Sequence, residues 1–166
     1  MADLGKLYAG FDMNFAKAMG HLCESADYVL PNITEACLIT GMEYKESYDE
    51  AYILELVQKM AALGPKSVIL TGVSYEPSTT GVVVYEDGKS SYYRHYRLPK
   101  GSHGTGDVYA SSFVGALMHG KETYEAAKIA ADYTVKCIEN TRDDPDHWYG
   151  VKFESVLPEL IRTLNQ

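Results

Sequence analysis

Apolar side chains recur at helical spacing in the first part of the chain. An amphipathic helix is predicted over residues 11–25, with an apolar stripe that repeats every three or four positions: Phe11, Phe15, Ala18, Met19 and Leu22. A second helix is expected to open at residues 32–35 and to end at Gly41, where a C-terminal glycine is typical. Further helices are predicted over residues 48–63, 108–119, 123–140 and 153–164, of which 108–119 is small and apolar almost throughout and is expected to be buried.

Short apolar runs between these helices predict strands. Residues 26–30 fit a short buried strand, and residues 67–72 form a near-continuous apolar run that is typical of a strand covered on both faces. Residues 81–85 and 90–97 are rich in β-forming side chains and are joined through Asp87-Gly88, which predicts a hairpin.

The order of these segments predicts the fold class. Strand, helix, strand, hairpin, helix and helix indicate one layered α/β domain over residues 1–166. Two features are unusual: residues 3–8 form a polar, glycine-punctuated opening where a buried strand is expected, and two buried parallel strands are few for a doubly wound sheet. Either upstream sequence is missing or the partner strands come from another chain.

Composition narrows the class of function. A formal net charge of -8 argues against nucleic acid or an anionic membrane as partner, because such binding depends on Lys and Arg. No apolar run is long enough to span a membrane and no signal peptide opens the chain, so a cytoplasmic protein is expected. The three cysteines are expected to be reduced and buried, and the five histidines lack the spacing of a transition-metal site, although oxygen-ligated Mg²⁺ would leave no such signature.

A glycine-rich turn is the most informative segment. Gly104, Thr105 and Gly106 let the backbone approach a ligand, and the helix that follows directs unpaired N–H groups and its positive dipole end toward it, forming an anion hole. Asp107 in the first turn could accept a proton from a hydroxyl that attacks a phosphate. The alternative is that Asp107 merely caps the helix and the glycines only form a turn.

Two further segments follow the predicted parallel strands, where ligands of open α/β sheets bind. Asn32 and Glu35 offer oxygens that could organise a hydrated Mg²⁺ and its phosphates, but the same spacing is a capping box. Thr71 and Gly72 could line a nucleotide pocket or simply end the second strand.

The three segments together resemble the C-terminal part of the ribokinase superfamily of small-molecule kinases. Within it, residues 26–36, 68–73 and 104–110 are most similar to pyridoxal kinases, including bacterial ones labelled pyridoxamine kinase, and the resemblance runs from residue 3 to about residue 140. It implies a ribokinase-like α/β/α sheet truncated at its N-terminus, ATP and Mg²⁺ as cofactors, and phosphorylation of the 5′-hydroxymethyl group of pyridoxal, pyridoxamine or pyridoxine. A homodimer is implied for the full-length form.

The resemblance also implies roles for the site residues. Asp107 would be the catalytic base, while the backbone of Gly104, Thr105 and Gly106 stabilises charge on the transferring phosphoryl group. In the other segments, Asn32 and Glu35 would lie near Mg²⁺ and the ATP phosphates, with Glu35 acting on the metal indirectly, and Thr71 with Gly72 would contact ATP. Asp3 and Tyr8 resemble the loop that approaches the phosphates. The hairpin and the loop before Gly104 would flank the adenine.

The sequence departs from this family pattern at its start. An Asp-Pro-Val strand and the whole region before it, which carries the vitamin pocket and most of the central sheet, have no counterpart, so the chain is expected to hold most of the nucleotide site and little of the acceptor site. Hydroxymethylpyrimidine kinase is a close rival, but its position after Gly-Thr-Gly is commonly Cys, whereas Asp107 favours the vitamin B6 kinases. A sugar kinase is less consistent with residues 31–35. The non-enzyme alternative is an inactive kinase fragment that acts as a binding module.

A few aromatic residues have structural interpretations. Tyr92, Tyr93 and Tyr96 in the hairpin are best explained as a half-exposed sheet face, although an interface or an adenine-stacking wall is the alternative. Trp148 is expected to pack the C-terminal helix onto the core.

Overall fold

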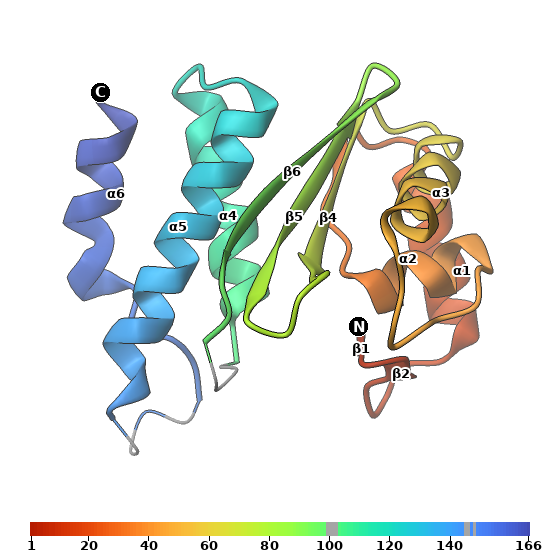
Figure 1. The fold of residues 1–166 in the computed structure, drawn as a ribbon, viewed down its shortest axis with the longest axis horizontal. Coiled ribbons are helices and arrows are strands. Elements are labelled where there is room, and N and C mark those ends of the chain that lie inside the picture. Colours follow the sequence, from red (N-terminus) through yellow and green to blue (C-terminus); the bar gives the residue numbers. More distant parts are fainter. Residues whose placement is uncertain (99–102, 145–146, 148) are drawn as a thin grey trace. The chain divides into compact units, whose positions relative to one another are not determined.

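A computed structural model describes residues 1–98, 103–144, 147 and 149–166. The chain divides into two compact units, Met1–Arg94 and His95–Gln166 (Figure 1). The first unit contains a mixed sheet with helices and the second is helical, which confirms the α/β class. The prediction of a single domain stays a prediction.

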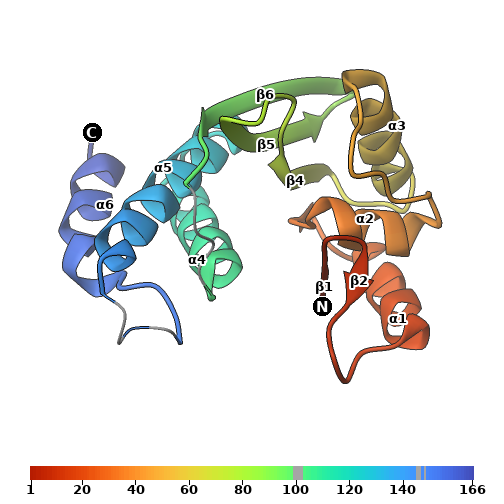
Figure 2. The same ribbon diagram turned by 60° about the horizontal axis from the view of Figure 1, so that its bottom comes forward.

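The first unit is built around a four-stranded sheet in the order β3-β4-β5-β6. β3 pairs with β4 in parallel, β4 pairs with β5 antiparallel, and both views show α1, α2 and α3 on the same side of β4 and β5 (Figures 1 and 2). The last two residues of β6 belong to the second unit. The elements are β1 (Ala2–Asp3), β2 (Lys6–Leu7), α1 (Met13–Cys23), β3 (Tyr28–Val29), α2 (Ile33–Thr40), α3 (Glu50–Ala61), β4 (Ser67–Val73), β5 (Thr79–Glu86) and β6 (Lys89–Tyr96).

Two tight turns fix the hairpins of this unit. Asp87 (φ 50°) and Gly88 (φ 74°) connect β5 to β6, which confirms the predicted hairpin, because a two-residue turn with both φ angles positive matches the twist of the strands. The opening residues were expected to form a loop and instead form the small antiparallel pair β1-β2. Leu4 (φ 49°) and Gly5 (φ 74°) adopt the same backbone geometry there, although Leu is an unusual residue for it.

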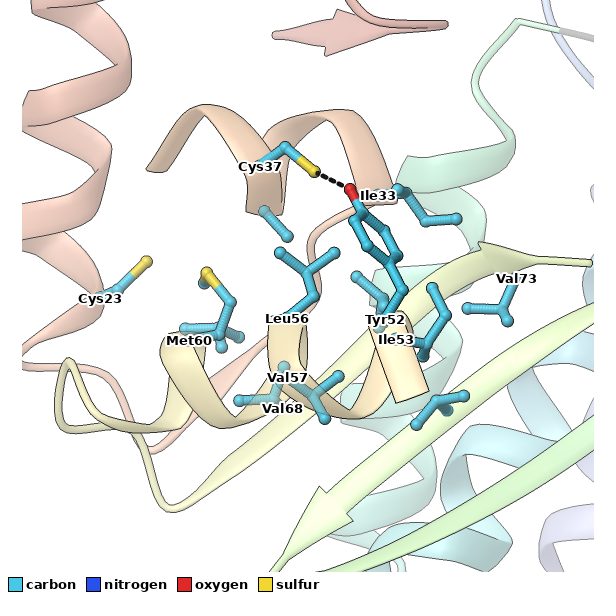
Figure 3. Packing of buried hydrophobic residues seen from close by; sticks show 14 residues of the cluster. Cys23, Ile33, Cys37, Tyr52, Ile53, Leu56, Val57, Met60, Val68 and Val73 are labelled. Carbon is cyan, nitrogen blue, oxygen red and sulfur yellow. Dashed lines mark hydrogen bonds between the residues drawn. The ribbon is translucent and has the colours of Figure 1, made fainter. Parts of the chain in front are cut away.

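The core of the first unit lies between α3 and the sheet. Leu56, Val57 and Met60 on α3 are fully buried with Val68 and Leu70 of β4 in one apolar cluster (Figure 3). These residues follow helical spacing on α3 and a near-continuous apolar run on β4, as the sequence predicts.

One polar pair lies within this core. The Tyr52 hydroxyl donates to the Glu43 carbonyl at 2.6 Å. The same hydroxyl lies 3.2 Å from the Cys37 sulfur, a contact that Figure 3 marks with a dashed line. Burial raises the pKa values of Tyr52 and Cys37, so both groups remain neutral. The described chain has three free cysteines, and all three are buried, as expected: Cys23, Cys37 and Cys137.

The predicted first helix is confirmed as α1, but its apolar stripe is not its buried face. α1 packs on α2, and its buried residues are Ala16 and Cys23. Phe15 is 40% exposed and Leu22 is 61% exposed. The buried side chains of α1 are thus small, and the large apolar side chains of its stripe are left exposed.

The first predicted strand is also less covered than expected. β3 has only two residues, of which Val29 is buried while Tyr28 is exposed and the adjacent Leu30 is half-buried. β3 pairs only with β4 among the described strands, so one of its edges has no neighbouring strand there.

The second unit consists of α4 (Thr105–Met118), α5 (Thr123–Arg142), a 3₁₀ turn (Glu154–Val156) and α6 (Leu157–Leu164). α4 packs against α5, and the Tyr109 hydroxyl donates to the Ala127 carbonyl at 3.2 Å. The expectation that this helix is buried holds for the face with Phe113 and Ala116, whereas Val114 and Met118 are exposed. Trp148, expected to pack the last helix onto the core, lies outside the described residues.

Gly81 lies in β5 at a position where the sheet leaves no room for a side chain. β4 and β5 shift register between Thr71 and Val73, opposite Gly81, and a Cβ added at Gly81 would lie 2.0 Å from the Tyr93 carbonyl oxygen. No side-chain rotation relieves a clash with backbone.

We therefore expect Gly81→Ala to lower the free energy of unfolding by about 1–3 kcal/mol, because β5 and β6 must separate to admit the methyl group. Urea denaturation followed by circular dichroism measures this change. Gly115→Ala is the control: a Cβ on this α4 residue meets nothing within 4 Å, and alanine favours the helix by about 0.5–1 kcal/mol. Equal effects of the two substitutions on the free energy of unfolding would contradict the steric role given to Gly81.

Candidate functional site

The carboxyl ends of β3 and β4 lie side by side in the first unit. A parallel bridge joins Asn32 to Thr71, and the Thr71 amide donates to the Pro31 carbonyl at 2.9 Å. The Thr71 hydroxyl donates to the same carbonyl at 3.3 Å. The structure therefore brings two of the predicted site segments together at the sheet end where α/β proteins bind ligands.

The segment after β3 forms a complete capping box. The Asn32 side-chain oxygen accepts from the Glu35 amide at 2.8 Å, and the Glu35 carboxylate accepts from the Asn32 amide at 3.1 Å. The Asn32 side-chain amide donates to the Ala2 carbonyl at 2.8 Å, and the second Glu35 oxygen pairs with the Met1 α-amino group at 2.7 Å. The capping alternative is thus confirmed for this pair. A role in binding Mg²⁺ or phosphate remains a prediction beside it.

The small β1-β2 hairpin brings Asp3 and Tyr8 to the same end of the unit. The Gly5 amide donates to the Thr34 hydroxyl oxygen at 2.9 Å, so the hairpin turn is held at the first turn of α2. Partial burial, and then the charges of Asp3 and Glu35, raise the pKa of Tyr8. The phenol is therefore a neutral hydrogen-bond donor among carboxylates.

Sequence reasoning missed two residues that position this hairpin. Thr34 accepts the Gly5 amide, and the Tyr44 ring lies so close to Gly5 that an added Cβ would come within 2.7 Å of it. Glycine at this position is thus required by a positive φ and by the ring together. The position of Thr34 in the first turn of α2 was the one available signal, and nothing local marks Tyr44.

Gly72 forms the irregular end of β4. Its φ of 76° lies in the left-handed region, and a Cβ built there meets nothing within 4 Å. The backbone of Gly72 is exposed beside Thr71, so a ligand could approach it closely. That Gly72 lines a nucleotide pocket stays a prediction.

The glycine-rich turn begins α4 in the second unit. Gly104 is the N-cap residue, with φ 76°, and no side chain caps the helix. Gly106 and Asp107 are exposed in the first turn, and Thr105 is half-buried. The first amides of a 14-residue helix are therefore left without a side-chain acceptor among the described residues, which is the arrangement an anion hole requires.

Asp107 differs from the carboxylate of the capping box. Among the described residues its side chain makes no cap bond and no ion pair, and it is exposed in the first turn of α4. The alternative that Asp107 caps this helix is therefore wrong. An exposed carboxylate beside uncapped amides can accept a proton from a bound hydroxyl.

The hairpin tyrosines take the structural role predicted for them. Tyr92 and Tyr93 are half-buried, and the Tyr92 hydroxyl donates to the Val73 carbonyl at 3.2 Å. In the second unit the Tyr96 hydroxyl bonds to the Glu139 carboxylate. The loop expected to flank the adenine includes residues 99–102, which lie outside the described residues.

The capping-box side chains are poorly placed to bind Mg²⁺ directly. Both Glu35 oxygens and both polar atoms of the Asn32 side chain already have partners within the protein, whereas Asp3 is exposed nearby. No three His, Cys, Asp or Glu side chains gather as a ligand set in the part of the chain that the structure covers. In that same part, no helix combines the length and apolar character needed to cross a bilayer.

Comparison with known proteins places this geometry in a family. The Phosphomethylpyrimidine kinase family matches residues 11–150. A hydroxymethylpyrimidine/phosphomethylpyrimidine kinase of Aquifex aeolicus is 32% identical over 120 residues, which cover 70% of this chain and 45% of that protein.

Solved structures share the fold. A Bacteroides thetaiotaomicron protein assigned as a phosphomethylpyrimidine kinase is 31% identical with a TM-score of 0.90, covering 96% of this chain and 56% of that one. A second crystal form of it, with pyridoxal, is 30% identical with a TM-score of 0.84, covering 100% and 58%. Pyridoxal kinase from Lactobacillus plantarum is 28% identical with a TM-score of 0.88, covering 98% and 59%.

These matches confirm the ribokinase-like fold class, and the chain spans about half the length of the relatives it matches. Relatives with both substrate names occur, so the coarser family is what the comparisons establish. The match over residues 11–150 covers most of the 166-residue chain, and the chain belongs to the phosphomethylpyrimidine kinase family.

Proposed function

We propose that this chain carries the nucleotide site and the catalytic base of a kinase that phosphorylates the 5′-hydroxymethyl group of a vitamin B6 compound, with ATP as donor. The observation that carries the proposal is Asp107, an exposed carboxylate without a capping partner among the described residues, in the first turn of a helix whose amides have no side-chain cap. A cap would be expected there if the segment served only to begin α4.

The proposed chemistry is transfer of the γ-phosphoryl group. The substrate hydroxyl oxygen forms a bond to the γ-phosphorus, the bond from that phosphorus to the β,γ-bridging oxygen breaks, ADP leaves, and Asp107 accepts the hydroxyl proton. The backbone amides of Gly104, Thr105 and Gly106 would stabilise the charge on the transferring group. Bound Mg²⁺ would supply charge neutralisation at the phosphates.

The residues of the first unit would serve the donor. Thr71 and the exposed backbone of Gly72 would contact ATP, and Asp3 and Tyr8 would approach its phosphates. Asn32 and Glu35 are occupied as a capping box, so their proposed part is to fix the first turn of α2 and to hold metal-bound water.

Two observations bear on the substrate. The Bacteroides relative, although assigned as a phosphomethylpyrimidine kinase, was crystallised with pyridoxal. The residue after Gly-Thr-Gly is Asp107, and the resemblance to the vitamin B6 kinases implies Asp at this position where hydroxymethylpyrimidine kinases commonly have Cys. Both favour a B6 compound. The family match and the Aquifex relative favour hydroxymethylpyrimidine as the second candidate. A homodimer remains a further prediction.

The direct test is Mg·ATP-dependent phosphorylation by the purified chain, followed by ³¹P NMR and by ADP release. Pyridoxal, pyridoxamine, pyridoxine and hydroxymethylpyrimidine are compared under the same conditions. We expect product with a B6 compound and at least tenfold slower transfer to hydroxymethylpyrimidine. The reverse preference would assign the chain to the second candidate, and ATP binding without transfer to any acceptor would make it a nucleotide-binding module.

The role of Asp107 has its own test. Asp107→Asn retains the size of the side chain and removes the base, so we expect the rate of transfer to fall about 10²–10⁴-fold while ATP affinity changes little. Glu125→Gln is the matched control, because Glu125 is also an acidic residue in a first turn of the same unit and pairs with Lys121. Equal loss of ATP binding and transfer would contradict the assignment of Asp107 as base.

A comparison of two N-cap residues distinguishes a structural role of Asn32 from a role in binding. Asn32→Ala and Asp49→Ala each remove the N-cap of a helix in the first unit and should each lower the free energy of unfolding by about 0.5–2 kcal/mol. Only Asn32→Ala is expected to weaken Mg·ATP binding as well, which isothermal titration calorimetry measures. If both variants lose stability and retain affinity, Asn32 is a cap alone.

A further inference from the structure

Three tyrosines of the first unit meet beside the end of β4, and we call them the tyrosine cluster: Tyr48 before α3, Tyr75 after β4 and Tyr92 on β6. The Tyr75 ring packs edge to face with both others, its centroid lying 6.2 Å from that of Tyr48 and 5.1 Å from that of Tyr92. All three side chains are half-buried against the apolar core of this unit. The rings alone would make the cluster an extension of that core.

Two hydroxyl groups of the tyrosine cluster also bind the backbone immediately after Gly72. The Tyr92 hydroxyl donates to the Val73 carbonyl at 3.2 Å, and the Tyr48 hydroxyl oxygen accepts from the Ser74 amide at 3.0 Å. The two phenols come from segments far apart in the sequence, yet they hold two consecutive residues. Side chains as well as strand pairing therefore fix the end of β4.

The backbone before Gly72 is fixed as well. The amide and the hydroxyl of Thr71 both donate to the Pro31 carbonyl, at 2.9 Å and 3.3 Å. Gly72 itself is exposed, has a φ of 76° and lies where β4 and β5 shift register. Glycine has more backbone freedom than any other residue, so an irregular strand end would be mobile there without support. Hydrogen bonds on both sides of Gly72 supply that support and leave its own backbone open.

The loop that follows β4 does not need the Tyr48 hydroxyl for its closure. The Ser74 hydroxyl lies 2.7 Å from the Thr79 carbonyl oxygen and 2.9 Å from the Glu76 carbonyl oxygen, and these contacts close residues 74–79 by themselves. The bond from the Ser74 amide to Tyr48 instead acts on the strand end. Its effect is on the orientation of the peptide groups next to Gly72.

We propose that Tyr48 and Tyr92 are positioning residues for the nucleotide, whose hydroxyl groups hold the backbone beside Gly72 in the orientation that receives ATP. The inference rests on the proposed function, in which Thr71 and Gly72 contact ATP. A strand end that is ordered before the ligand arrives loses less conformational entropy on binding, so the affinity for ATP increases. Each hydroxyl acts on ATP through the backbone.

The test removes each hydroxyl and keeps its ring. In Tyr48→Phe and in Tyr92→Phe we expect the Kd for Mg·ATP, measured by isothermal titration calorimetry, to rise about three- to tenfold, because one hydrogen bond to the strand end is lost. Where transfer is measured, the KM for ATP should rise by the same factor while kcat at saturating ATP stays unchanged. Amide hydrogen exchange, followed by NMR, should become about tenfold faster at Ser74 in Tyr48→Phe.

The control variant is Tyr52→Phe. The Tyr52 ring stacks on Tyr48 with centroids 5.9 Å apart, but its hydroxyl donates to the Glu43 carbonyl and not to β4. Because Tyr52 is only 7% exposed, its substitution should lower the urea midpoint at least as much as Tyr48→Phe does. The affinity of Tyr52→Phe for Mg·ATP should remain that of the unaltered chain.

Three results would overturn the inference: a stability loss in Tyr48→Phe with unchanged ATP affinity, an equal loss of ATP affinity in Tyr52→Phe, or unchanged exchange at the Ser74 amide. The binding readout also distinguishes this inference from the proposed function. ATP binding without transfer would contradict the proposed function alone, and the affinities of the variants would still decide the role of the tyrosines. An unaltered chain that binds no Mg·ATP would overturn both.

Discussion

The parallel pairing of β3 with β4 is the constraint on which the first unit depends. β3 contributes only two residues to it, yet the pairing continues through the bridge between Asn32 and Thr71. That bridge places the start of α2 beside the end of β4 and fixes where the β1-β2 hairpin can dock, since the Asn32 side chain holds the Ala2 carbonyl. Without it, Asp3, Tyr8, Asn32 and Thr71 would have no reason to lie at one end of the unit.

Local chemistry made much of the fold predictable from sequence. Asp87-Gly88 specified a turn because both residues accept a positive φ, and Asn32 with Gly41 marked both ends of α2 because cap geometry depends on the side chain at one or two positions. The buried face of α1 could not be predicted in this way. Its spacing identifies a helix with a large apolar stripe, but which face is buried depends on the partner, and the buried side chains proved to be Ala16 and Cys23.

The candidate site was also predictable only where local residue type and position determine it. Residue type and position after a strand identified Asn32, Glu35 and Thr71, and the structure confirms that they lie together. Spacing alone could not distinguish a helix cap from a ligand-binding residue, because the same spacing serves both. The hydrogen bonds of Glu35 show that it caps α2. Asp107 makes no such bond at the start of α4, so it is not a cap there. Tyr44 was missed because its contact with Gly5 joins residues far apart in sequence.

The end of β3 connects the sheet to the capping box. Pro31 and Asn32 follow β3 directly and make the contacts with Thr71 that define the site in the first unit. Asn32 also exchanges hydrogen bonds with Glu35, so the residue that pairs with Thr71 fixes the first turn of α2 as well. The order of the site therefore depends on the short pairing of β3 with β4, because that pairing places the backbone on which the side chains of the site stand.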